Sequence, residues 1–426
     1  MLKTVAIIIF ILTYILLLSL PKIKPYVALG AGAIFIIIGI LPLSEVLGAL
    51  DFNVLMMIAG TMGLVSLFIK SGMPAFLADL IIAKSGNVCV AVVGLSVFAG
   101  FISAFVDNVA TVLMIAPVAI AVAKKLNISP VLPIISISIF SNLQGAATLV
   151  GDTTSIMLGG ALDMSFLDFF VYNGKMGMFF VVEISAIVAT VILYFYFRKE
   201  KEKIEPFKPE KVTYMFPTYL LLAMLALLIG ASFIQDKPDV TSGAICCILA
   251  VIGIVVDCIR DKSLHPIKEV WSDIDYQTLL LLVGLFLVIG GIEYVGVISD
   301  IANFIAATFG DNIFLLYTVI VWGSMLISAF IDNIPYVATM LPVVAGIAAS
   351  LGVDPTVLYF GLLTGATLGG NITPIGASAN VAAIGILRKE GHEVPTGTFM
   401  KMSVPITIAA VATGYLIVWL VFGVAI

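Results

Sequence analysis

Charged residues are scarce in this sequence: Asp, Glu, Lys and Arg together make up 11% of the 426 residues. Soluble domains usually carry about 25%. Hydrophobic residues make up 61% of the chain, and they fall in blocks of about 20 residues, the length that a helix needs to cross a hydrocarbon core of roughly 30 Å. The composition therefore excludes a soluble domain and predicts an all-α, polytopic protein whose main partner is the lipid bilayer.

Histidine and cysteine are also rare, with two and four residues respectively. None of the cysteines has the spacing of a metal site, so we expect them to be small apolar side chains. The sequence contains no phosphate-binding loop, dinucleotide fingerprint or hydrolase nucleophile motif. It also has no basic segment with interleaved aromatic residues. We therefore expect no enzyme, no bound cofactor and no nucleic-acid partner.

Two phrases of the sequence are nearly identical. SAFVDNVATVLMIAP begins at Ser103, and SAFIDNIPYVATMLP begins at Ser328. Further pairs share this offset of 225 residues, or an offset of 224 upstream: Gly145 and Gly370, Thr148 and Thr373, Gly151 and Gly376, and Asp51 and Asp275. Such self-similarity indicates a duplicated unit. We predict two copies, residues 1–197 and 216–426, joined by a charged linker at 198–215.

Each unit has the same order of predicted elements. The first has spans at 4–20, 27–43 and 53–70, an interfacial stretch at 74–84, paired helices at 88–104 and 109–124, a long block at 131–162 and a span at 176–197. The second has spans at 216–233, 241–257 and 276–294, an interfacial stretch at 297–309, paired helices at 312–331 and 334–350, a long block at 356–388 and a span at 402–424.

The distribution of Lys and Arg indicates how the units cross the membrane. If each pair of helices is a re-entrant hairpin, each unit crosses five times and the two units are inverted. With the linker in the cytoplasm, all Lys and Arg then fall on the cytoplasmic side except Lys3, Lys175 and Lys237, as the positive-inside rule requires. Two full spans per pair would instead place Lys84 opposite Lys124. We predict two inverted repeats of five spans in the plasma membrane, with both termini outside.

Helix-breaking residues gather in the middle of the two long blocks, at GAATLVGDTTS from Gly145 and GNITPIGASAN from Gly370. Irregular backbone at membrane depth is tolerated only where it is buried in protein or lines a cavity. Broken helices in matching places of two inverted halves indicate a transport site near the membrane centre. The alternative is close helix packing around small residues.

Each hairpin carries an Asp-Asn pair at its tip, Asp107-Asn108 and Asp332-Asn333. An ionisable side chain at membrane depth costs roughly 2.5 kcal/mol or more, so it indicates a functional site by default. Carboxylate and amide oxygens, together with free carbonyl groups at helix ends, suit Na⁺ or a transferable proton. We predict a possible Na⁺ site at these four residues. The alternative is helix capping by the two Asp residues, which is compatible with ion binding.

Asp152 lies in the first break, whereas its counterpart in the second is Ala377. This unduplicated charge indicates a specific task, either binding of substrate or a proton, or a local helix cap. Glu183 is also unmatched; it either faces the cavity or pairs with a neighbour. Asp51 and Asp275 precede spans and are expected to be caps.

The predicted ion or substrate site combines the hairpin tips with the polar residues of the breaks. It comprises Asp107, Asn108, Thr111, Gly151, Asp152, Thr153, Asp332, Asn333, Thr373, Gly376, Ser378 and Asn380.

The hairpin and break phrases resemble those of the ion transporter superfamily, in the branch of arsenite pumps, NhaD-type sodium–proton antiporters and the melanosomal P protein, with a citrate transporter-like domain. The likeness is carried by SAFVDNVATVL from Ser103, GAATLVGDTTS from Gly145, SAFIDNIPYVATMLPV from Ser328 and LGGNITPIGASANV from Leu368. The resemblance implies inverted repeats with re-entrant hairpins and broken helices, an elevator-like movement and a homodimer.

Divalent-anion symporters of that superfamily carry Ser-Asn-Thr at each hairpin tip and Gly-Thr-Pro at the first break. This chain has Asp107, Asp152 and Asp332 in these places. Three added carboxylates would repel a dicarboxylate, and we expect no Lys or Arg near the breaks to offset them. We therefore expect exchange of Na⁺ or Li⁺ for H⁺. The alternatives are proton-coupled efflux of arsenite or antimonite, sodium-coupled symport of an anion, and a channel, which could not move an ion against its gradient.

The topology can be tested at Lys203 in the linker. In a background without the native cysteines, Lys203→Cys should react with a membrane-impermeant maleimide only from the cytoplasmic side. We expect labelling in inside-out vesicles and none in intact cells. Labelling of intact cells would overturn the predicted orientation.

Overall fold

The computed structural model describes residues 2–125, 128–204, 212, 214–310 and 312–424. Within these residues the regular structure is almost entirely helical. Seven of the described helices are long and apolar enough to cross a membrane. The prediction of an all-α, multi-pass integral membrane protein is confirmed.

The helices follow the predicted order closely. The first half contains α1 (Leu2–Ser19), α2 (Lys24–Ile38), α3 (Val46–Ala49), α4 (Phe52–Lys70), α5 (Met73–Lys84), α6 (Val88–Ser103), α7 (Asn108–Lys125), α8 (Val131–Gly145), α9 (Thr153–Ala161) and α10 (Met178–Phe197). The second half contains α11 (Phe216–Ala231), α12 (Thr241–Asp261), α13 (His265–Asp273), α14 (Tyr276–Tyr294), α15 (Val297–Phe309), α16 (Ile313–Ser328), α17 (Asn333–Leu351), α18 (Thr356–Leu363), α19 (Ser378–Lys389) and α20 (Thr396–Val418).

Both long blocks are interrupted, as predicted. The first is divided into α8 and α9, with irregular backbone between them. The second leaves α18 through a π-helical turn, Thr364–Leu368, and a 3-10 turn, Gly370–Ile372, before α19 begins. Two elements were not predicted: α13 and a small antiparallel hairpin of β1 (Val171–Tyr172) and β2 (Lys175–Met176). Part of the predicted linker, residues 205–211 and 213, lies outside the described residues.

Side chains cap matching helices in the two halves. Asp51 accepts a hydrogen bond from the backbone N–H of Val54 at 2.9 Å, and Asp275 accepts one from Thr278 at 3.2 Å. The capping predicted for both Asp residues is confirmed. Asn87 and Asn312 cap α6 and α16 in the same way. Because each cap satisfies an N–H group that has no partner within the helix, these four residues fix where the helices begin.

Glycine allows two helix pairs to approach backbone to backbone. A Cβ atom at Gly60 of α4 would lie 2.5 Å from the backbone of Cys246 and Cys247 in α12. A Cβ atom at Gly284 of α14 would likewise meet the backbone of Ala28 in α2. Small residues permit such close packing between membrane helices. As a result, α2 of the first half packs on a helix of the second half, and α12 of the second half packs on a helix of the first.

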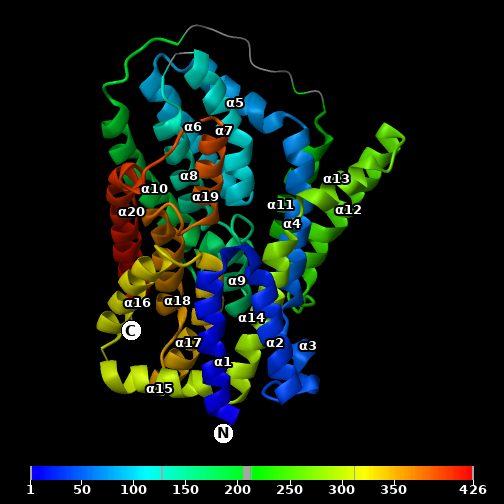
Figure 1. Ribbon diagram of the computed structural model, residues 1–426, viewed down its shortest axis with the longest axis vertical. Coiled ribbons are helices and arrows are strands. Elements are labelled where there is room, and N and C mark those ends of the chain that lie inside the picture. The colour runs from blue at the N-terminus through cyan, green and yellow to red at the C-terminus, as the bar shows by residue number, and fades with distance from the viewer. Residues whose placement is uncertain (1, 126–127, 205–211, 213, 311, 425–426) are drawn as a thin grey trace.

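The paired helices lie toward opposite ends of the molecule. Figure 1 shows α5, α6 and α7 toward one end of the long axis, and α15 and α17 toward the other. Among the broken helices, α8 and α19 pack beside α6 and α7, whereas α9 and α18 pack on α17. The orientation of each pair relative to a membrane, and hence the re-entrant and inverted arrangement, stays a prediction.

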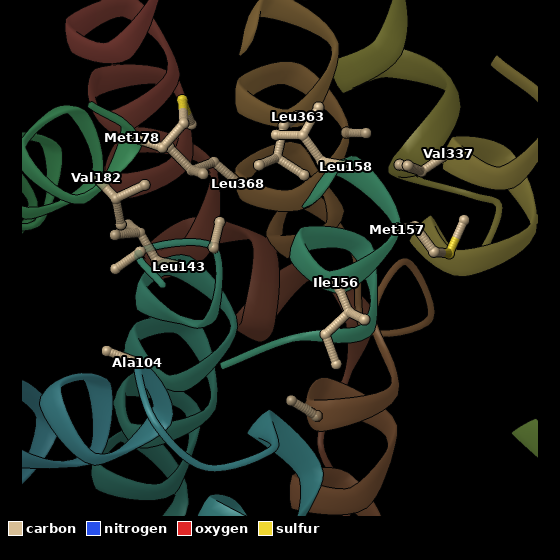
Figure 2. Close-up of a cluster of buried hydrophobic side chains, with 14 of the residues drawn as sticks. Ala104, Leu143, Ile156, Met157, Leu158, Met178, Val182, Val337, Leu363 and Leu368 are labelled. Carbon is tan, nitrogen blue, oxygen red and sulfur yellow. The ribbon is translucent and has the colours of Figure 1, made fainter. Parts of the chain in front are cut away.

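Apolar side chains pack α9 against helices of the second half. Figure 2 shows Ile156, Met157 and Leu158 of α9 close to Val337 of α17 and Leu363 of α18, and all five are buried. These contacts join the first broken helix to elements of the second half.

Glycine packing can be tested with a matched pair of substitutions. Gly60→Ala places a methyl group against the backbone of α12, so we expect overpacking to cost about 1–3 kcal/mol and to lower the apparent melting temperature in detergent. Gly30→Ala is the control, because nothing lies within 4 Å of the added methyl group. Equal melting temperatures for the two variants would contradict this account of the packing.

Candidate functional site

The two tip carboxylates each cap a helix. Asp107 Oδ1 accepts hydrogen bonds from the N–H groups of Val109 and Ala110, both at 3.0 Å. Asp332 Oδ1 accepts one from Ile334 at 3.3 Å, and its Oδ2 accepts one from Ser378 Oγ at 3.1 Å. The capping alternative is therefore confirmed for both residues. Among the described residues, Oδ2 of Asp107 receives no hydrogen bond.

Each break is anchored to the hairpin helix that precedes the tip. Thr148 Oγ1 donates to the carbonyl of Ala104, at the end of α6. Thr373 Oγ1 donates to the carbonyl of Ala329, at the end of α16. These bonds are repeated at an offset of 225 residues, so both halves fold locally in the same way.

Glycine is required where the breaks pass over the ends of these helices. A Cβ atom at Gly151 would lie 2.5–2.7 Å from three carbonyl oxygens, those of Gly145, Ala104 and Ser103. A Cβ atom at Gly376 would meet three equivalent carbonyl oxygens at 2.5–2.8 Å. The two glycines of the predicted site therefore serve the close approach of backbone to backbone.

The two breaks are joined by side-chain hydrogen bonds. Asn142 Nδ2 donates to the carbonyl of Thr367 at 2.9 Å, and Asn371 Nδ2 donates to the carbonyl of Ile139 at 3.0 Å. The hydroxyls of Thr154 and Thr367 lie 2.9 Å apart. Asn142 also links this region to the first tip, because its Oδ1 accepts from Asn108 Nδ2 at 3.1 Å.

Asn142 and Asn371 were not predicted as site residues. Each is a polar carboxamide within, or at the end of, an otherwise apolar helical block, and this feature of the sequence could have identified them.

Asp152 precedes α9 and is 4% exposed. It makes no side-chain capping hydrogen bond to that helix. Its Oδ2 accepts instead from Thr154 Oγ1 at 2.9 Å. The geometry therefore does not support the alternative that Asp152 is merely a helix cap.

A cavity of about 570 Å³ brings half of the predicted residues together. Its lining includes polar groups of the tips and breaks: Asp107, Asn108, Asp152, Thr153, Asn333 and Ser378. The opposite wall is formed by α4, α13 and α14 and includes Ser66, Lys70, Asp273 and Asp275. We call this the first cavity.

Asp332 lines a second cavity of about 560 Å³, together with Tyr14, Lys24 and Pro335. The two cavities share Asp275, Thr278 and Ser378 in their walls. The three tip and break carboxylates are therefore divided, with two in the first cavity and one in the second.

The remaining predicted residues line neither cavity: Thr111, Gly151, Thr373, Gly376 and Asn380. Thr111 is buried beside the first tip, and its hydroxyl has no hydrogen-bond partner among the described residues. Asn380 Nδ2 lies 3.3 Å from the carbonyl oxygen of Thr373 and 3.4 Å from that of Gly370. Asn380 therefore braces the second break.

Lys24 overturns one expectation. Its Nζ lies 3.7 Å from Asp332 Oδ2, so the prediction that no Lys or Arg lies near the breaks is wrong. Lys24 begins α2, and neighbouring α1 contacts α17, because Tyr14 donates to the carbonyl of Pro335 at 3.0 Å. Packing in space, which sequence separation conceals, brings this lysine to the second tip.

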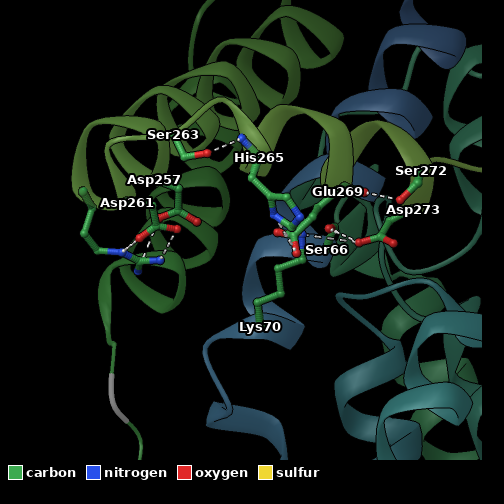
Figure 3. A network of polar contacts seen from close by, with 10 residues as sticks. Ser66, Lys70, Asp257, Asp261, Ser263, His265, Glu269, Ser272 and Asp273 are labelled. Atoms are coloured by element: carbon green, nitrogen blue, oxygen red, sulfur yellow. Dashed lines mark hydrogen bonds and ion pairs between the residues drawn. The ribbon is translucent and has the colours of Figure 1, made fainter.

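A charged network borders the first cavity on the side of α4 and α13. Lys70 Nζ lies 3.1 Å from Glu269 and 3.6 Å from Asp273, and Ser66 donates to Asp273 at 2.6 Å. His265 Nδ1 lies 3.2 Å from Glu269 (Figure 3). The positive charge of Lys70 is therefore already matched by two carboxylates.

Glu183 pairs with a neighbour, which was one of its two predicted alternatives. Gln144 Nε2 donates to both carboxylate oxygens, at 3.0 and 2.9 Å. Gly100 leaves room for this amide, because a Cβ atom there would collide with Gln144. At the equivalent positions of the second half the large and small residues are exchanged. Met325 corresponds to Gly100 and Gly369 corresponds to Gln144, and Gly369 leaves room for Met325.

No group of three or more His, Cys, Asp or Glu side chains in the described residues could hold a metal ion. A cation beside Asp107 would therefore depend largely on amide, hydroxyl and carbonyl oxygens. Such neutral oxygens suit a hard cation of low charge more than a transition metal.

The chain is similar to several bacterial transporters and to a human protein. It is 29% identical to the uncharacterized transporter Rv2684 of Mycobacterium tuberculosis, over 98% of both chains. It is 25% identical to the uncharacterized transporter slr0753 of Synechocystis, over 96% of this chain and 95% of that protein. It is 25% identical to the human P protein, over 92% of this chain and 56% of that protein.

Two solved structures share the fold. The YdaH transporter of Alcanivorax borkumensis superposes with a TM-score of 0.63 and 16% identity, over 89% of this chain and 88% of that one. MtrF of Neisseria gonorrhoeae, described as illuminating a class of antimetabolite efflux pumps, superposes with a TM-score of 0.57 and 16% identity, over 92% and 85%. The citrate transporter family matches residues 8–365. The chain is therefore a membrane transporter that belongs to the citrate transporter family.

Proposed function

We propose that this transporter exchanges Na⁺ or Li⁺ for protons. One observation carries the proposal: Asp107 and Asp152 line the same cavity, and within the described residues neither forms an ion pair. A carboxylate at membrane depth is costly unless its charge is offset. A proton or a small cation is the ligand that would offset it, and competition between these two ligands is what an exchanger requires.

The lining residues suggest a division of roles. Asp107 and Asn108 supply a carboxylate and an amide oxygen for the cation. Asp152, held by the hydroxyl of Thr154 at 2.9 Å, carries the proton and competes with the cation for the cavity. Asn333 and Ser378 complete the wall from the second half.

We propose that exchange proceeds by alternating access. The two cavities adjoin one another, because both are lined by Asp275, Thr278 and Ser378. We further propose that the protein lies in the plasma membrane as a homodimer, with residues 198–215 in the cytoplasm and both termini outside.

A citrate-class anion is the second candidate. The family's description and the position of Lys24 favour it. The second cavity nevertheless carries Asp332 and Asp275 against this single lysine, and like charges are unfavourable for an anionic ligand. Cation–proton exchange is therefore the stronger proposal.

The proposal can be tested in inside-out vesicles from cells that lack their own antiporters. After respiration has built a pH gradient, NaCl or LiCl should dissipate it, and a pH-sensitive dye should report the change. Asp107→Asn and Asp152→Asn should reduce the response to background, because each removes a charge that a cation or proton must neutralise. Asp239→Asn, an exposed acid in a loop, is the control and should respond like the wild type.

The other substrates give distinct outcomes in the same vesicles. A wild-type protein that ignores Na⁺ and Li⁺ would contradict the proposal. Citrate uptake driven by Na⁺ would establish the second candidate, and accumulation of arsenite driven by the pH gradient would establish metalloid transport.

A further inference from the structure

The two halves carry different charges at equivalent places. The first half has Asp152 where the second has Ala377. Lys24 of α2 lies beside the second tip. The residue of α12 that corresponds to Lys24 can be identified from how α2 and α12 pack on their neighbours.

Gly60 and Gly284 are equivalent residues, and they pack on Cys246 and Ala28 respectively. Cys246 and Ala28 are therefore equivalent in packing. Lys24 lies four residues before Ala28, and the neutral residue Ser242 lies four residues before Cys246. The duplicated architecture has thus gained an acid in one half and a base in the other.

Lys24 is placed to neutralise the second tip. Its Nζ lies 3.7 Å from Asp332 Oδ2, and the two side chains are 25% and 18% exposed. The distance is within the range of an ion pair but exceeds that of an N–H···O hydrogen bond. Asp332 Oδ2 also accepts from Ser378. The Lys24 ammonium group therefore interacts with the Asp332 carboxylate electrostatically, while the hydrogen bonds of that carboxylate come from other groups.

We infer that Lys24 is a fixed cation for the second tip, so that each protomer binds its mobile cation at the first tip only. This inference rests on the proposed cation–proton exchange and specifies its stoichiometry. The positive charge of Lys24 neutralises Asp332 and repels a second cation from the same carboxylate. Asp107 has no such partner in the described residues, and Asp152 adds a further negative charge to its cavity. The two tips share a sequence phrase but differ in the ligand that they take.

The inference predicts the number of ions bound. Saturation binding of radioactive Na⁺ to the purified full-length protein should give one ion per protomer in the wild type and none in Asp107→Asn. Lys24→Gln should bind two ions. In the double variant Lys24→Gln, Asp332→Asn the gained ion should be lost.

Two controls separate the charge of Lys24 from its packing. Lys24→Arg keeps a fixed cation and should bind one ion. Lys22→Gln removes an exposed lysine two residues away and should also bind one ion. If Lys24→Gln proves too unstable to purify, the comparison of wild type with Asp332→Asn decides, because both should then bind one ion.

Each outcome distinguishes this inference from the proposed function. Two ions in the wild type, one of them lost in Asp332→Asn, would overturn the inference and leave cation exchange intact. One ion in Lys24→Gln would also overturn the inference alone. A wild-type protein that binds neither Na⁺ nor Li⁺ would overturn both.

Discussion

Irregular backbone deep in a membrane protein must find its hydrogen-bond partners within the protein, because hydrocarbon offers none. The two helix breaks meet this constraint with short polar side chains. Thr148 and Thr373 bond to the carbonyl groups of the helices that precede the tips, and Asn142 and Asn371 bond to carbonyl groups of the opposite half. These bonds, and the close approach of backbone at Gly151 and Gly376, fix the breaks beside the tips that line the two cavities.

Much of the helix order could be predicted because matching sequence phrases recur in the two halves. The capping residues Asp51 and Asp275 mark helix starts in both copies, and the glycine-rich phrases mark both breaks. Helix α13 was missed because its polar, charged face makes it resemble a loop in an apolar chain. Lys24 was misplaced because counting positive charges assigns a residue to one side of a membrane and does not report which helix its side chain meets.

The two halves share local backbone contacts at the site, but some of their side chains differ. In the first half the bulky residue is Gln144 of α8, which fills the space at Gly100 of α6, whereas in the second half Met325 of α16 fills the space at Gly369. This exchange conserves the total side-chain volume, but only the first half has an amide, that of Gln144, which donates to the carboxylate of Glu183. No property of Glu183 alone in the sequence could reveal this, because the residue that makes room for its partner is a glycine on another helix.

The crossed packing of α2 on α14 and of α12 on α4 constrains how the chain can be made. The face of α2 that packs on Gly284 has its partner in a helix that the ribosome synthesises much later. Until α14 is inserted, that face lacks this partner, because helices enter a bilayer before they associate with one another. The first half therefore cannot complete its tertiary structure during its own synthesis, because α2 and α4 must first meet helices of the second half.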